Sequence, residues 1–203
     1  MLVTHELSPI YDKYSKVLIL GTIPSVKSRE IGFYYAHPSN RFWPILENLF
    51  NTKLSTKEEK IEFLNKNHIA LWDVFKSCDI HASSDASIKN YELNDINMIT
   101  NIANIKAIFC TGKTAYTNLI KNYKTTIPIF SLPSPSSANA TFKLSDLIKE
   151  YNKIREYIWH FVMYFSIKKS KLITTISNIF KSFWLNWKNS ANLKVFPIYW
   201  KNF

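Results

Sequence analysis

The chain has 203 residues, a length that suits one domain with an additional segment. Hydrophobic residues make up 46% of the chain and aromatic residues 15%, which is enough for a packed core. The two cysteines, Cys78 and Cys110, are far apart in the sequence. Their spacing argues against a zinc site, a cysteine-ligated iron–sulfur cluster and a disulfide framework, and it indicates a reducing, cytoplasmic location.

The net charge of +11 suggests a polyanionic partner, but this charge is unevenly distributed. Residues 159–203 carry seven lysines and no acidic residue, which leaves +4 for residues 1–158. We therefore expect a folded domain over residues 1–158 and a basic, aromatic C-terminal extension over residues 159–203. The extension has two interpretations. It is an arm that binds DNA or an anionic membrane surface, or a poorly ordered segment, which its poor hydrophobic periodicity favours.

Buried apolar runs and amphipathic segments alternate along the domain. In chain order, the pattern predicts a strand over residues 16–20, helices over 41–50 and 57–66, a strand over 69–72, a helix over 93–102, a strand over 107–110, a helix over 113–121, a strand over 127–130 and a helix over 143–158. Thr56 and Glu59 form a capping box at the second helix, and Pro128 indicates an edge strand or an early end of the last strand. The alternation predicts a three-layer α/β/α sandwich around a central, mostly parallel four-stranded sheet.

The stretch Gly32–Trp43 is unusually rich in large rings and polar groups. Three consecutive aromatic residues lead into His37-Pro38-Ser39-Asn40, and Arg41-Phe42-Trp43 then opens a helix. Adjacent rings and fixed donors suit a pocket for a flat heterocycle. The alternative is a half-buried aromatic loop in which Asn40 caps the helix.

Two further loops follow predicted strands, namely Gly21–Ser25 and Ser131–Ala140. Ligands of parallel sheets bind beyond the carboxyl ends of the strands, so we expect both loops and the aromatic stretch to form one site. Gly21–Ser25 is neither a P-loop nor a dinucleotide fingerprint. The serines and two prolines of Ser131–Ala140 suit contacts with phosphate oxygens.

Together these motifs resemble the uracil-DNA glycosylase superfamily. The matching motifs are Gly21-Thr22-Ile23-Pro24-Ser25, Tyr34-Tyr35-Ala36-His37-Pro38-Ser39-Asn40-Arg41-Phe42-Trp43 and Leu132-Pro133-Ser134-Pro135-Ser136-Ser137-Ala138-Asn139-Ala140. Leu71-Trp72-Asp73-Val74, Ser77-Cys78 and Ser84-Asp85 also look like the DNA-deoxyinosine (hypoxanthine-DNA) glycosylase branch. The resemblance covers about residues 5–158.

The resemblance implies a monofunctional DNA glycosylase that removes hypoxanthine first and uracil second during base-excision repair. It implies DNA containing deaminated bases as the partner, with no metal, no cofactor and no membrane, and we expect a monomer. Ile23 departs from the mismatch-specific branch, which has an asparagine at this position. The hypoxanthine branch then implies Asn40 as the catalytic residue, one that positions water for attack on an oxocarbenium-like sugar.

The remaining site residues are also implied by the resemblance. Thr22, the Ile23 backbone N–H and His37 are expected to stabilise the leaving base, while Tyr35 stacks on it and Phe33 or Tyr34 shapes the pocket. The predicted DNA contacts are Ser134, Ser136, Ser137, Ala138 and Asn139.

Plainer roles stay open for several of these residues. Phe33 can equally be a core residue and His37 a turn residue, and we expect Phe42 and Trp43 in the core. Asp73 and Asp85 are expected to orient loops.

The alternative function is a catalytically silent nucleic-acid-binding module, which Ile23 favours and Asn40 disfavours. A third interpretation, a membrane-associated factor, requires residues 159–203.

Overall fold

The structure is a computed structural model that describes residues 2–4, 6–79 and 88–169, with side chains up to Trp159. The chain divides into two compact units, residues 1–161 and 162–203. The predicted poor order of the extension concerns mostly residues 170–203, which lie outside the described residues, as does the predicted Ser84-Asp85 motif.

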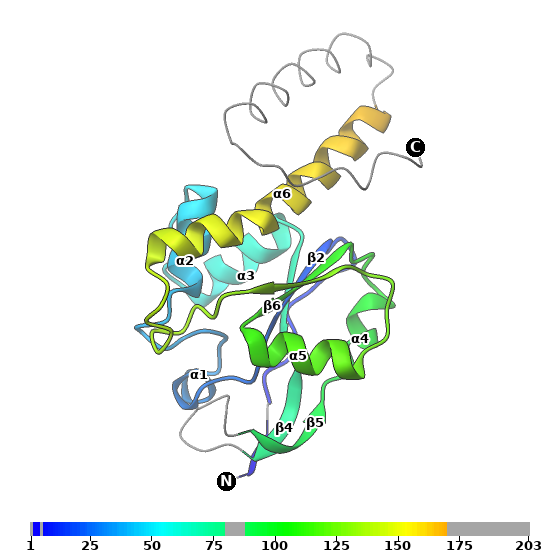
Figure 1. Cartoon of the computed structure of the whole chain (residues 1–203). Coiled ribbons are helices and arrows are strands. Elements are labelled where there is room, and N and C mark those ends of the chain that lie inside the picture. The colour runs from blue at the N-terminus through cyan, green and yellow to red at the C-terminus, as the bar shows by residue number, and fades with distance from the viewer. Residues whose placement is uncertain (1, 5, 80–87, 170–203) are drawn as a thin grey trace. The chain divides into compact units, whose positions relative to one another are not determined.

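A four-stranded parallel sheet forms the centre of the first unit (Figure 1). Its strands are β2 (Val17–Gly21), β3 (Ile69–Asp73), β6 (Ala107–Thr111) and β7 (Ile129–Leu132), in the order β3-β2-β6-β7. All pairings are parallel. Every residue of β2, β3 and β6 is buried, which explains why these strands are continuous apolar runs rather than alternating ones. The predicted edge position of β7 is confirmed.

Helices cover both faces of this sheet (Figure 1). One layer contains α2 (Phe42–Phe50), α3 (Lys57–Lys66) and α6 (Leu144–Lys169). Within it, the Arg155 guanidinium donates to the Leu49 carbonyl, and Phe50 packs edge-on against Phe63. The other layer contains α4 (Asn97–Thr100) and α5 (Lys113–Asn122), joined by the hydroxyls of Thr100 and Tyr123. The predicted three-layer α/β/α sandwich is confirmed.

A second, antiparallel sheet was not predicted from the sequence. It comprises β1 (Leu2–Thr4), β4 (Phe75–Asp79) and β5 (Lys89–Leu93), in the order β1-β4-β5. The predicted helix over residues 93–102 is wrong in its first half, because Leu93 ends β5 and only Asn97–Thr100 is helical. The Asn94 amide donates to the carbonyls of Asp73 and Phe75, and this holds the chain beside the sheet.

Local sequence signals set the ends of several helices. Thr56 and Glu59 form the predicted capping box, in which each side chain accepts a backbone N–H of the other residue. Helix α6 begins beside the predicted start but continues beyond Ile158 to Lys169. Helix α1 (Val26–Ile31) was not predicted, since six residues are too few for a periodic pattern.

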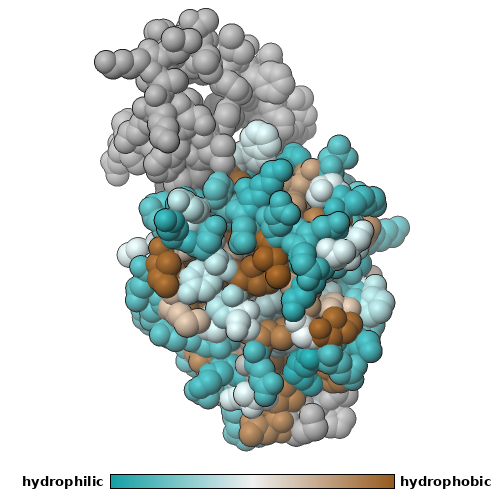
Figure 2. Space-filling view, turned by 180° about the vertical axis from the view of Figure 1, so that it is seen from behind, coloured by the Kyte–Doolittle hydropathy of each residue, from teal (hydrophilic) through white to brown (hydrophobic). Residues whose placement is uncertain are grey.

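The face seen in Figure 2 is mostly hydrophilic, with separate apolar patches. Exposed large hydrophobic residues of the described part include Val26, Ile31 and Ile102. None of the helices within the described residues combines the length and apolarity that crossing a bilayer requires.

Candidate active site

A cavity lies where β2, β3 and β6 end. Its volume is about 140 Å³, several times the ~30 Å³ that one water molecule occupies. It brings together the three loops predicted to meet, namely Gly21–Ser25, the aromatic stretch and Ser131–Ala140. The lining residues are Gly21, Thr22, Ile23, Pro24, Ser25, Ser28, Tyr34, Tyr35, Asn40, Asp73, Thr111, Ser134, Pro135 and Ser136. The position agrees with the rule that parallel sheets bind ligands beyond their carboxyl ends.

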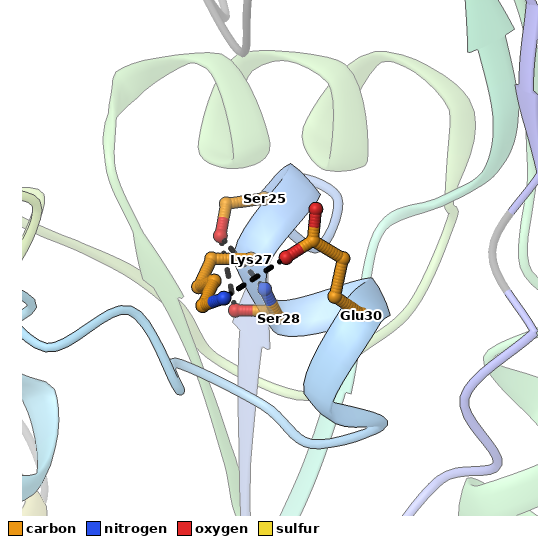
Figure 3. A network of polar contacts seen from close by, with 4 residues as sticks. All are labelled: Ser25, Lys27, Ser28 and Glu30. Carbon is orange, nitrogen blue, oxygen red and sulfur yellow. Dashed lines mark hydrogen bonds and ion pairs between the residues drawn. The ribbon is translucent and has the colours of Figure 1, made fainter.

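Helix α1 builds one wall through a pair of serines. Ser25 caps the helix by accepting the Ser28 N–H, and its hydroxyl donates to the Ser28 Oγ at 3.1 Å (Figure 3). Ser28 is only 2% exposed, and its Oγ also accepts the Ala36 N–H at 3.2 Å. Lys27 and Glu30 form an exposed ion pair on the same helix. Ser28 thus ties the helix to the aromatic stretch.

Tyr35 is held in a strained backbone conformation. Its φ of 52° lies in the left-handed region, which costs a non-glycine residue roughly 1–3 kcal/mol. Its ring stacks on Phe42 with a centroid distance of 4.0 Å, and its hydroxyl lies 2.8 Å from the Thr111 Oγ1. These contacts fix the ring beside the cavity, with one face covered by Phe42.

Asn40 precedes Arg41, the N-cap residue of α2, and also lines the cavity. Its Oδ1 accepts the N–H of Phe42, the first residue of α2, at 2.9 Å, and this bond orients the amide. Because an amide oxygen has two lone pairs and the amide nitrogen two protons, the side chain keeps bonding capacity for a ligand or a water.

Arg41 joins the aromatic stretch to the loop after β7. Its guanidinium donates to the backbone carbonyls of Pro135, Ser136, Asn139 and Phe142, and its own N–H donates to Pro135 as well. A planar fork with five donors can satisfy several carbonyls at once, whereas an ammonium cannot. Arg41 therefore holds two of the three loops in one arrangement.

The Asp73 carboxylate is 3% exposed and comes very close to the end of β2. A Cβ added to Gly21 would lie 2.1 Å from the Asp73 Oδ1 and 2.8 Å from the Tyr35 Oη, so only glycine fits there. Burial, and secondly the Asp73 charge, raise the pKa values of Tyr34 and Tyr35 well above their ordinary range. Both phenols are therefore protonated at physiological pH.

The structure brings many of the residues predicted from the sequence to the cavity, but not all of them. Among the predicted base contacts, Thr22, Ile23 and Tyr35 line it. Phe33 and His37 are not among the lining residues. Phe33 is buried and stacks on Trp43, as in a core, while the exposed His37 accepts hydrogen bonds from the Ser39 N–H and hydroxyl.

The predicted DNA-contact residues lie on the loop after β7. Ser134 and Ser136 line the cavity, whereas Ser137 is exposed and bonds the Ser39 hydroxyl at 2.8 Å. Ala138 is exposed, and the Asn139 amide donates to the Ser134 carbonyl within the loop. The hydroxyls of Ser134 and Ser136 each accept a backbone N–H, which leaves their protons available to an acceptor such as a phosphate oxygen.

Three residues that shape the site have weak signals in the sequence. Ser28 carries no signal because serine is common in helices and turns, and Thr111 is the last residue of an apolar strand. Arg41 belongs to the aromatic motif, but the motif alone does not indicate its role. Its position directly after Asn40 is the available signal, because Asn40 lines the cavity while Arg41 bonds the loop after β7. Within the described residues, no group of three or more His, Cys, Asp or Glu side chains is placed to hold a metal ion.

Comparisons with known proteins agree with this geometry. The sequence model of the uracil DNA glycosylase superfamily matches residues 8–158. A hypoxanthine DNA glycosylase of Methanosarcina barkeri is 34% identical over 108 residues, which cover 52% of this chain and 68% of that protein. A hypoxanthine DNA glycosylase of Methanosarcina acetivorans is 31% identical over 160 residues, which cover 75% of this chain and 93% of that protein.

A solved structure shares the fold. The solution NMR structure of a candidate uracil DNA glycosylase from Methanosarcina acetivorans matches with a TM-score of 0.64 and 28% identity. The match covers 76% of this chain and 99% of that one. This chain therefore belongs to the uracil DNA glycosylase superfamily, whose DNA glycosylases are hydrolases of N-glycosyl bonds.

Proposed function

We propose that this chain is a monofunctional DNA glycosylase that hydrolyses the N-glycosidic bond of a deaminated base in DNA. Hypoxanthine is the first substrate and uracil the second, and the abasic product enters base-excision repair. The observation that carries the proposal is the Asn40 amide, oriented by the Phe42 N–H at the wall of a small polar cavity. The two Methanosarcina relatives named hypoxanthine DNA glycosylase support the choice of base.

Asn40 is suited to hold a water rather than to deprotonate it. A neutral amide does not accept a proton near neutral pH, but it can both donate to and accept from a bound water. If the bond between the base and C1′ breaks early, the sugar becomes an oxocarbenium-like cation. Water then needs to be positioned more than activated, and Asn40 fulfils that need.

Asp73 supplies a negative charge that Asn40 lacks. Its buried carboxylate lines the same cavity and lies against the end of β2 beside the Tyr35 hydroxyl. A carboxylate in a site of low dielectric stabilises a nearby cationic sugar and can accept the proton of the attacking water. We therefore assign Asp73 a catalytic role beyond the loop-orienting one expected from the sequence.

The leaving base is held by stacking and by hydrogen-bond donors. Phe42 covers one face of Tyr35, so the exposed part of the Tyr35 ring is available to a base extruded from DNA. The Thr22 hydroxyl and the Ile23 backbone lie at the cavity wall, where donors stabilise charge that develops on the base. Ser134, Ser136 and Ser137 contact the DNA backbone.

The test is strand cleavage, after alkali, of labelled oligonucleotides that carry one deoxyinosine or one deoxyuridine. Wild type should cleave at the modified base, and Asn40→Ala and Asp73→Asn should each lose roughly 10²–10³-fold in rate. Asn48→Ala is the matched control, because Asn48 is an exposed asparagine on α2 away from the cavity lining, and it should retain full activity.

The same samples decide between an enzyme and a silent binding module. DNA binding is measured alongside cleavage, and circular dichroism checks that each variant is folded. A folded wild type that binds the oligonucleotides but cleaves neither would contradict the proposed activity and leave the binding module.

A further inference from the structure

Ser28 has a hydroxyl whose bonding capacity is almost fully used. A hydroxyl has two acceptor lone pairs and one proton. The Ser25 hydroxyl and the Ala36 N–H occupy both lone pairs, at 3.1 and 3.2 Å, and Figure 3 shows the first of these two bonds. Among the residues that the structure describes, none accepts the Ser28 proton. Ser28 is therefore a pure donor.

This donor is buried and faces a ligand site. Ser28 is 2% exposed and is one of the residues that line the cavity. A buried donor without an acceptor costs roughly 1–3 kcal/mol, so a ligand that supplies an acceptor gains affinity. Because two donors already bond to the Ser28 Oγ, its O–H is polarised and strengthened as a donor.

Deamination changes a group on the base with which such a donor can form a hydrogen bond. Adenine carries an amino group at C6 and cytosine one at C4, and both groups present protons. Deamination replaces the amino group by a carbonyl oxygen, which accepts hydrogen bonds, and gives hypoxanthine and uracil. A hydroxyl that can act only as a donor forms a hydrogen bond with the carbonyl oxygen. Opposite an amino group, which also presents protons, the same hydroxyl has no acceptor.

We propose that Ser28 is the specificity-determining residue of the cavity, its hydroxyl donating a hydrogen bond to the carbonyl oxygen that deamination places on the base. This inference rests on the proposed glycosylase function and explains why one site accepts both a purine and a pyrimidine. It also gives the rejection of adenine and cytosine a physical cause, since a site built to hydrogen-bond one group discriminates strongly against a base that lacks it.

The test compares deoxyinosine with deoxynebularine, which is the same purine nucleoside without the oxygen at C6. Single-turnover excision and equilibrium binding are measured for wild type and Ser28→Ala with both oligonucleotides. The preference of wild type for deoxyinosine should fall by about tenfold in Ser28→Ala, the scale of one neutral hydrogen bond. Intrinsic differences between the two nucleosides cancel in this double comparison.

Two variants separate base reading from a structural role. Ser25→Ala removes the helix cap and the bond to Ser28, which frees one Ser28 lone pair but leaves the Ser28 proton. It should therefore lower excision of both substrates and keep most of the preference for deoxyinosine. Ser28→Cys keeps a weak donor and acceptor and should lose part of the preference, and it decides the question if Ser28→Ala does not fold.

An unchanged preference in a folded Ser28 variant would overturn the inference, whether it is read from excision or from binding. A deoxyinosine oligonucleotide that wild type does not cleave would instead contradict the proposed activity. The two failures are therefore distinguishable.

Discussion

Replacing Arg41 by alanine should destabilise the protein and loosen the cavity at the same time. The guanidinium donates to four backbone carbonyls in the segment from Pro135 to Phe142. Each hydrogen bond to a charged group contributes ~1.5–3 kcal/mol, but bonds in one fork are not additive, and some freed carbonyls gain water. We therefore expect a loss of about 3 kcal/mol in the free energy of unfolding.

Urea unfolding measures this loss directly. With a slope of ~2 kcal/mol per molar urea, the midpoint should fall by roughly 1.5 M in Arg41→Ala. Arg41→Lys keeps the charge but offers one compact ammonium, so it should recover less than half of the loss. Excision of deoxyinosine should decrease in both variants, since small displacements of site residues cost up to about 10²-fold in rate.

The control is Arg155→Ala, because Arg155 donates to the Leu49 carbonyl and is not among the residues that line the cavity. It should lower stability with little effect on excision by the folded protein. If Arg41→Lys were as stable and active as wild type, charge alone would suffice, and the argument from the geometry of the fork would be refuted.

Two further predictions concern the sheet end and helix α6. Gly21→Ala should lower stability by ~1–3 kcal/mol and excision sharply, because its Cβ would overlap the Asp73 Oδ1. Gly32→Ala is the control, because no atom lies within 4 Å of a Cβ added there, and it should cost only the strain of its φ of 70°, ~1 kcal/mol. Equal losses of the two variants in unfolding assays would refute the contrast. Burial raises the pKa of Glu156, so its ionisation costs stability as the pH rises through that raised pKa. Glu156→Gln should therefore be more stable than wild type at pH 7, with the gain absent below about pH 4 in unfolding measured across pH.

The parts of the fold that sequence predicts well are those in which burial is continuous. Strands β2, β3 and β6 are buried along their whole length and are visible as apolar runs. Strand β5 is mostly exposed and has no alternating pattern, and its pairing with β4 is irregular. Its register depends on contacts that are distant in sequence, so local patterns did not reveal it.

The site shows the same division between local and distant signals. The meeting of three loops follows from the fold class. Asn40 lines the cavity and accepts the Phe42 N–H, but Arg41 rather than Asn40 is the N-cap residue of α2. The left-handed conformation of Tyr35 has no sequence signal, because bulky residues rarely adopt it. It is held by tertiary contacts of the Tyr35 ring with Phe42 and of its hydroxyl with Thr111, and the next residue, Ala36, donates its N–H to the Ser28 hydroxyl.

The residue at position 23 departs from the mismatch-specific branch, and packing supplies a reason. The partly buried Ile23 packs against the main core and against Val3 and Cys78, two paired residues of the antiparallel sheet, while its loop lines the cavity. A polar side chain directed at that cluster would be buried without water, at a cost of ~1–3 kcal/mol unless it found a partner. Position 23 thus secures the cavity wall to the second sheet. The polar groups of the proposed mechanism are those of Asn40 and Asp73, which reach the cavity from the aromatic stretch and the end of β3.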